Sequence, residues 1–205
     1  MGEGLADVRQ KLRTAQRVAA RDPFFAGNVD ALIAAQPKDL EASEIEVRLG
    51  ATWLDKKYIE QFMYETFETP RYLRGQIEIS YVPYTAEWQV SRKSMVRYND
   101  VAAFTTYGTD RASAYRLLED ALNLRDIRIY DTIEDADGRE RRVLNAKETT
   151  LAAQKQQLIR DAFKDWIWKD PERRETLVRQ YNEEMNSTRP REYDGSHIVF
   201  SGMNP

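Results

Sequence analysis

Apolar residues recur every three or four positions along the first third of the chain, which is the spacing of one face of an α-helix. This spacing predicts a helix over residues 5–20 that ends at Asp22-Pro23, and a second helix over residues 24–35. A third helix is predicted over residues 55–67, where large aromatic side chains share one face. Residues 1–70 are therefore expected to form a helical subdomain.

A shorter helix is predicted between the second and third of these helices. Ser43 and Glu46 have the spacing of a capping box, so a helix from Ser43 through Leu49 is expected, with Gly50 as its stop. Together with the helix over 55–67 it would have the outline of a helix-turn-helix. That second helix carries acidic as well as basic residues, so plain helical packing is favoured over entry into a DNA groove.

The middle of the chain changes to an alternation of apolar and polar residues. Residues 76–82 and 88–90 alternate in this way and are rich in β-branched and aromatic side chains, so they are predicted to form two antiparallel strands. A helix is expected over residues 110–122, with Thr109 as its cap. This part of the chain is therefore predicted to mix helices and strands.

A second hairpin and two further helices are predicted after this region. Residues 126–133 and 139–144 are expected to pair across a turn at Asp137-Gly138. A long helix then begins at an Asn145 cap and runs to Trp168, and Asp170 caps a last helix that begins with Pro171.

The long helix has an apolar face that either packs in the core or docks a partner domain, because periodicity alone does not say what covers it. The face predicted to be apolar consists of Leu151, Leu158, Ile159, Ala162, Phe163, Trp166 and Ile167.

These elements predict an α+β fold that is mainly helical, with a small antiparallel β region of hairpins in the middle. The expected organisation is a helical subdomain over 1–70, a mixed α/β subdomain over 71–150 and a helical pair over 151–185. Residues 186–205 are polar and rich in turn-forming residues, so they are expected to be a linker toward a further domain.

Composition narrows the classes of function. The 205 residues carry a net charge of -3, which argues against a strongly basic nucleic-acid binder or a polybasic membrane anchor. The chain has no Cys, which excludes disulfides and thiolate metal sites and fits the cytoplasm. No apolar run approaches the roughly 20 residues that span a bilayer.

Sequence motifs for catalysis are missing. The chain has no glycine-rich phosphate loop, no dinucleotide-binding GxGxxG turn and no GxSxG nucleophile elbow. The single histidine, His197, is expected to be a surface or packing residue. The carboxylates Asp100, Asp110 and Glu119 have no spacing that demands a shared metal, which disfavours a hydrolase or nuclease. The prediction is therefore no catalytic residue, no cofactor and no metal.

One region combines positive charge with aromatic side chains, a pairing that can hold phosphates and stack bases on a β surface. The alternative is that the aromatic residues pack in the core while the cations stay solvated. The candidate nucleic-acid residues are Arg71, Arg74, Tyr81, Tyr84, Trp88, Arg92, Lys93 and Arg97.

Three strings of the sequence resemble segments of very large proteins of bacterial conjugative elements and phages. They are QPKDLEASEIEVRLGATWL (36–54), ALNLRDIRIYDT (121–132) and FKDWIWKDPERRETLVRQYNEEMNSTRPREYDGSHIVFSGMNP (163–205). Proteins of this family join an adenine-specific DNA methyltransferase region to a SWI/SNF-like helicase of the DEAD/DEAH-box superfamily. The present chain is similar to the stretch between the two, so the linker over 186–205 would lead to the helicase core.

The resemblance implies a context and no active site, because neither the phosphate loop of the motor nor the Asn-Pro-Pro-Tyr motif of the methyltransferase occurs here. It implies a non-catalytic accessory domain whose partners are the helicase and methyltransferase regions of one parent protein. DNA is a further partner if the basic region guides it to the motor. The alternative is a structural or protein-interaction connector that makes no DNA contact.

Overall fold

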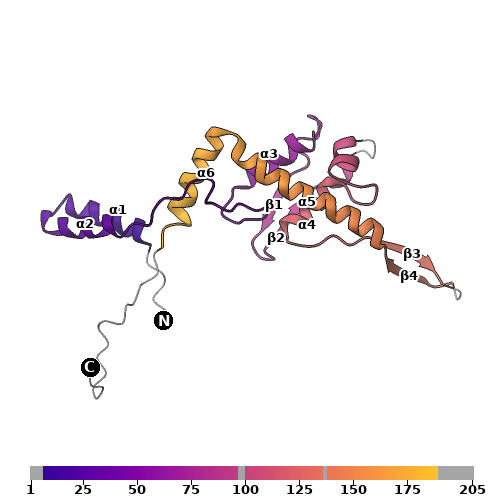
Figure 1. The fold of residues 1–205 in the computed structure, drawn as a ribbon, viewed down its shortest axis with the longest axis horizontal. Coiled ribbons are helices and arrows are strands. Elements are labelled where there is room, and N and C mark those ends of the chain that lie inside the picture. Colours follow the sequence, from indigo (N-terminus) through magenta and orange to yellow (C-terminus); the bar gives the residue numbers. More distant parts are fainter. Residues whose placement is uncertain (1–6, 97–99, 136–137, 189–205) are drawn as a thin grey trace, which may run out of the picture. The chain divides into compact units, whose positions relative to one another are not determined.

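The computed structural model describes residues 7–96, 100–135 and 138–188 (Figure 1). It confirms the predicted fold class, because the chain is mainly helical and its described strands form two separate two-stranded antiparallel sheets. The chain divides into two compact units. The terminal unit consists of Met1–Ile45 with Thr176–Pro205, and the central unit consists of Glu46–Glu175. The domain boundaries expected after residues 70 and 150 both fall inside the central unit.

The terminal unit contains helix α1 (Val8–Ala19), the 3₁₀ turn η1 (Pro23–Phe25), helix α2 (Ala26–Ala34) and the end of helix α6 (Pro171–Glu184). Two distant parts of the chain meet in it. The backbone N–H of Val8 donates to the carbonyl of Ser187 at 2.9 Å. The Asn182 side chain bonds both backbone groups of Leu40, at 2.8 and 2.9 Å. These bonds fix the start of α1 and the segment after α2 to the end of α6.

The core of the central unit is built by helices α3 (Lys56–Thr66), α4 (Ala114–Leu122) and α5 (Ala146–Lys169). Phe62 of α3 and Phe163 of α5 meet edge to face with ring centroids 5.1 Å apart. Phe67 and Tyr115 meet in the same way at 5.3 Å. Each of these four side chains is fully buried. Residues from three predicted subdomains therefore share one aromatic core.

A hairpin of β1 (Ile79–Val82) and β2 (Glu87–Val90) packs between two of these helices, and both of its edges are covered. On the β1 edge the N–H of Ile79 donates to Glu60 of α3 at 2.9 Å. On the β2 edge Asn123 bonds both the N–H and the carbonyl of Trp88, each at 2.8 Å. A two-stranded sheet is marginal alone, and these helix-borne side chains supply partners for its free backbone groups.

The second hairpin consists of β3 (Tyr130–Glu134) and β4 (Glu140–Leu144) and has mostly exposed side chains. Arg111 and Asn145 donate to the two carboxylate oxygens of Asp131, at 2.8 and 2.7 Å. These hydrogen bonds lower the pKa of Asp131 below its usual value. Gly138 has a φ of 75°, as the predicted turn requires, while Asp137 lies outside the described residues.

Two short helical turns complete the described structure, the 3₁₀ turn η2 (Lys93–Met95) and the π-helical turn η3 (Ala102–Thr106). Within the described ranges, no helix combines the length and the apolar character needed to cross a lipid bilayer.

The prediction of a short helix over Ser43–Leu49 is wrong. Residues 42–44 form a turn, in which the Glu44 carboxylate accepts from the N–H of Glu41 at 2.8 Å, and residues 45–48 are in no helix or strand. Ile45, Val47 and Leu49 are buried while Glu46 and Arg48 are exposed. This alternation has the period of a strand, and it outweighs the capping-box spacing. The helix-turn-helix alternative loses its first helix for the same reason.

Two further details differ from the sequence prediction. Helix α4 begins at Ala114 and not at residue 110, because the Thr109 hydroxyl accepts from the N–H groups of Arg111 and Ala112 and so closes a separate turn. On α5 the buried stripe includes Ala152 and Gln156. Leu151 and Leu158, expected on the apolar face, are 40% and 43% exposed.

Candidate functional site

The predicted basic and aromatic region is divided between the core and the surface. Tyr81 and Trp88 are directly opposite each other on the hairpin, with ring centroids 5.0 Å apart. They lie on the same face as Ile79 and Val90, which are buried against the core, and Trp88 itself is 6% exposed. Ser80 and Gln89 pair with each other and lie on the opposite, exposed face of the hairpin. Trp88 is therefore a core residue, whereas Tyr81 beside it is partly exposed.

Two of the predicted cations already have structural partners. Arg74 donates from Nε to the carbonyl of Thr69 at 2.9 Å and from Nη2 to the carbonyl of Tyr64 at 3.3 Å, which satisfies carbonyls at the end of α3. Lys93 forms an ion pair with Glu119 of α4. The other carboxylate oxygen of Glu119 accepts from the N–H of Val90 at 2.8 Å. Lys93 and Glu119 thus hold the end of β2 to α4, while Arg74 stabilises the turn that follows α3.

The remaining predicted residues are exposed but come from separate places. Arg71 lies in the turn before β1, Tyr84 lies between the two strands and is 98% exposed, and Arg92 follows β2. Tyr81 is 36% exposed at the margin of the packed face. Arg97 lies outside the described residues. Nucleic-acid binding by these residues stays a prediction.

Two of the carboxylates considered for hydrolysis have structural partners. Glu119 binds Lys93 and the N–H of Val90. Asp100 accepts a hydrogen bond from the N–H of Ala103 at 3.1 Å and so caps the turn that follows it. Across 7–96, 100–135 and 138–188 no three His, Cys, Asp or Glu side chains are grouped as metal ligands. His197 lies outside these ranges.

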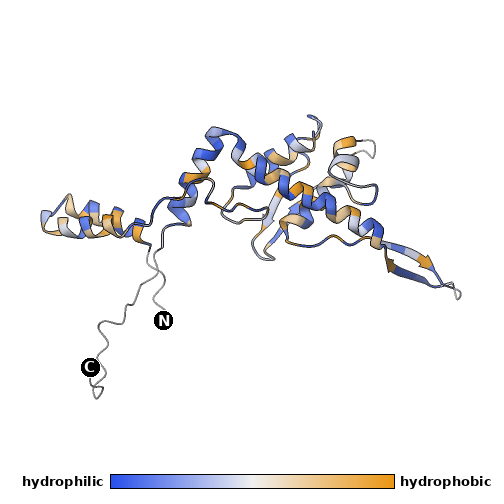
Figure 2. Ribbon diagram, viewed as in Figure 1, coloured by the Kyte–Doolittle hydropathy of each residue, from blue (hydrophilic) through white to orange (hydrophobic). Residues whose placement is uncertain are grey.

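An apolar opening lies on the α1–α2 hairpin, which sequence reasoning did not single out. Of these two helices only Val8 is buried, and no residue of α2 is. Figure 2 shows hydrophobic positions along both helices. Between them is a groove of about 610 Å³, here called the hairpin groove. It is lined by Gln10, Lys11, Thr14, Ala15, Val18, Phe25, Asn28, Ala31 and Leu32.

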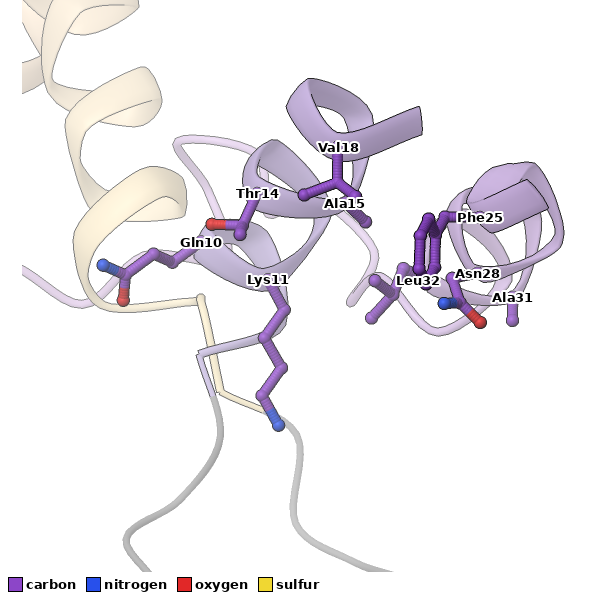
Figure 3. Close-up of a pocket in the computed structure, with 9 residues that line it drawn as sticks. All are labelled: Gln10, Lys11, Thr14, Ala15, Val18, Phe25, Asn28, Ala31 and Leu32. Atoms are coloured by element: carbon purple, nitrogen blue, oxygen red, sulfur yellow. The ribbon is translucent and has the colours of Figure 1, made fainter. Parts of the chain in front are cut away.

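The side chains of the hairpin groove give it a defined chemistry. Figure 3 shows Phe25 and Leu32 extending from the α2 side toward Ala15 and Val18 of α1. Lys11 is the sole charged residue in the lining, beside a few amide and hydroxyl groups. Val18 is 40% and Phe25 is 37% exposed. The helical periodicity predicted both helices, but the groove between them is visible only in the three-dimensional arrangement of the described residues.

A family model matches residues 48–187, about two thirds of the chain, and its description is Domain of unknown function (DUF8437). The chain belongs to this family. The DUF8437 match takes in the aromatic core, both strand hairpins and α6, whereas α1 and α2 precede it. No curated protein and no solved structure matches the chain.

Proposed function

We propose that this chain is a non-catalytic connector of a larger DNA-processing protein, in which the hairpin groove docks a helix of the adjoining helicase motor. The observation that carries the proposal is the groove itself: two helices present an apolar face and bury almost nothing of their own. A pair of helices that exposes such a stripe gains stability when a third element covers it. The parent protein would be the mobile-element methyltransferase and helicase that the sequence resembles, acting in the bacterial cytoplasm.

The chemistry of the groove specifies the kind of helix it would take. Two packed helices leave a trough between their ridges that accepts the apolar stripe of a third helix. Lys11 stands at this trough without any carboxylate in the lining. A complementary helix therefore carries an acidic side chain next to its apolar positions, because a charge buried at an interface requires a partner.

The docking proposal predicts that polar substitutions in the groove weaken binding to the motor region. Changing Val18→Gln together with Ala31→Gln places amides in the apolar lining, and burying each unpaired amide costs about 1–3 kcal/mol. The dissociation constant for a separately purified helicase motor of the resembled class should rise at least about tenfold. Isothermal titration calorimetry measures this change.

A matched control uses the neighbouring positions on the same two helices. Arg17→Gln with Asp30→Gln introduces the same residues, keeps the net charge and leaves the lining of the groove unchanged. This pair should bind the motor as the unmodified chain does. Equal binding by both pairs, or no binding by the unmodified chain, would contradict docking through this groove.

DNA guidance over residues 71–98 is a second candidate, favoured by the exposed Arg71, Tyr72 and Arg92. If these side chains contact phosphates, Arg71→Gln with Arg92→Gln should weaken binding of a forked DNA probe and flatten its dependence on salt. Fluorescence anisotropy at low and physiological salt gives both quantities. Binding that is unaffected by this pair would reject the strand region as the DNA contact.

A further inference from the structure

A second opening, in the central unit, has a chemistry that the fold does not explain. Its volume is about 340 Å³, within the usual size range of small-ligand pockets, about 300–1,000 Å³. Arg48, Arg160 and Lys164 line it with a single carboxylate, that of Glu46. Buried Leu49 and Ala121 are also part of the lining. This opening is called the cationic pocket below.

The backbone brings the three cations together from two separate elements. Arg160 and Lys164 are one turn apart on α5, so their side chains share one face of that helix. Arg48 comes from the segment 45–49, where the alternation buries Val47 and Leu49 and leaves Arg48 exposed. Gly50 then presses against the carbonyl end of α4.

None of the three cationic side chains has a hydrogen bond or ion pair with another described residue. This distinguishes them from Arg74, whose guanidinium satisfies backbone carbonyls, and from Lys93, which pairs with Glu119. Two like charges one turn apart on a helix oppose folding slightly, so this arrangement is not accounted for by stability. An anion in the pocket would remove the repulsion.

The acidic groups near the cationic pocket do not cancel its positive charge. Glu46 is part of the lining, and Asp161 accepts from the Gln157 amide at 2.9 Å. The carbonyl end of α4 lies nearby and also carries partial negative charge. An anionic ligand would therefore sit toward Arg160 and Lys164 on α5. The exposed Leu124 side chain offers an apolar contact beside them.

We propose that the cationic pocket binds a phosphate group, carried either by a DNA backbone or by a nucleotide. A guanidinium donates two parallel hydrogen bonds to phosphate oxygens, and a lysine ammonium adds a compact charge. Two arginines and a lysine in one concave site supply both kinds of contact. This proposal is independent of docking through the hairpin groove, which lies in the other unit.

The test compares two charge-matched variants of the full chain. Arg160→Gln with Lys164→Gln removes two cations from the pocket, and Lys147→Gln with Lys169→Gln removes two exposed cations from the ends of the same helix. Binding is measured with single-stranded DNA, duplex DNA, ATP and inorganic pyrophosphate. The pocket pair should lose affinity by at least about tenfold, and the control pair by less than about threefold.

The four probes distinguish the sources of the phosphate. Pocket-dependent binding of DNA alone assigns the site to a nucleic-acid backbone, and pocket-dependent binding of ATP or pyrophosphate alone assigns it to a free phosphorylated compound. Binding of both classes supports the shared phosphate chemistry. Absence of binding to every probe, or equal losses in the two variant pairs, overturns the proposal.

Discussion

The hydroxyl of Tyr115 is the most strongly perturbed titratable group described in the central core. Its side chain is fully buried, and the hydroxyl lies 2.7 Å from that of Thr69, which is itself buried. Burial raises the pKa of Tyr115 from 10.0 to about 12, because the phenolate would lose its hydration. The hydrogen bond with Thr69 opposes this shift without cancelling it.

This shift predicts a loss of stability at high pH. Between pH 10 and 12 the unfolded chain releases the Tyr115 proton while the folded chain keeps it, so folding is weakened as pH rises. The free energy of unfolding keeps its full value from this group below pH 10, and it falls by up to about 1.4 kcal/mol per pH unit above pH 10. Urea unfolding across this range should show a smaller decline for Tyr115→Phe than for the unmodified chain. Equal declines of stability in the two proteins would contradict the assignment of this pH dependence to Tyr115.

Single residues also show what the sequence could and could not reveal about the candidate sites. The alternation that predicted β1 and β2 also determines which side chains share a face, so the burial of Trp88 was open to prediction once the pairing was known. The partners of Arg74 and Lys93 could not be predicted, because these partners are backbone carbonyls and a carboxylate that belong to neighbouring elements. The grouping of Arg48 with Arg160 was likewise hidden, since more than a hundred positions of sequence separate them.

At the scale of elements, Gly50 lets the segment 45–49 approach the end of α4 closely. Its φ is 82°, and a Cβ at this position would lie 2.2 Å from the carbonyl oxygen of Leu122. Gly75 has a similar φ of 80°, but a Cβ there would meet nothing within 4 Å. The two glycines therefore share the same backbone strain on substitution and differ in steric contact.

Gly50→Ala should consequently destabilise the chain far more than Gly75→Ala. The left-handed backbone alone costs an alanine about 1–2 kcal/mol, which is the loss expected for Gly75→Ala. The clash with backbone at Gly50 should add about 2 kcal/mol or more, because neither group can rotate away. Equilibrium unfolding in urea measures both losses. Similar values for the two variants would show that the segment does not approach α4 this closely.

Local signals predicted most elements, and competing signals explain the exceptions. Asp55, Asn145 and Asp170 were identified or implied as helix starts, and each accepts a backbone hydrogen bond there. Ser43 with Glu46 carried a similar signal, but the alternation of Ile45, Val47 and Leu49 was stronger because it buries three apolar side chains. A cap contributes about 1 kcal/mol, less than such burial.

At the scale of the whole molecule, the two units differ in how completely they bury their apolar residues. The central unit has a closed aromatic core and contains most of the DUF8437 match. In the terminal unit, residues 7–45 and 176–188 leave the hairpin groove open. Composition and periodicity predicted that the chain folds and is mainly helical, but the division into a closed unit and an open one depends on contacts between distant residues. The proposed connector function rests on the open groove of the terminal unit.

Hydrogen–deuterium exchange of the full chain, with and without the helicase motor, tests the docking proposal most directly. A covered groove excludes water and rigidifies both helices, so the amides of α1 and α2 should exchange more slowly when the motor is present. The Val18→Gln, Ala31→Gln pair should abolish this protection, and the Arg17→Gln, Asp30→Gln pair should retain it. Unchanged exchange in both helices under conditions where the motor binds would contradict the account.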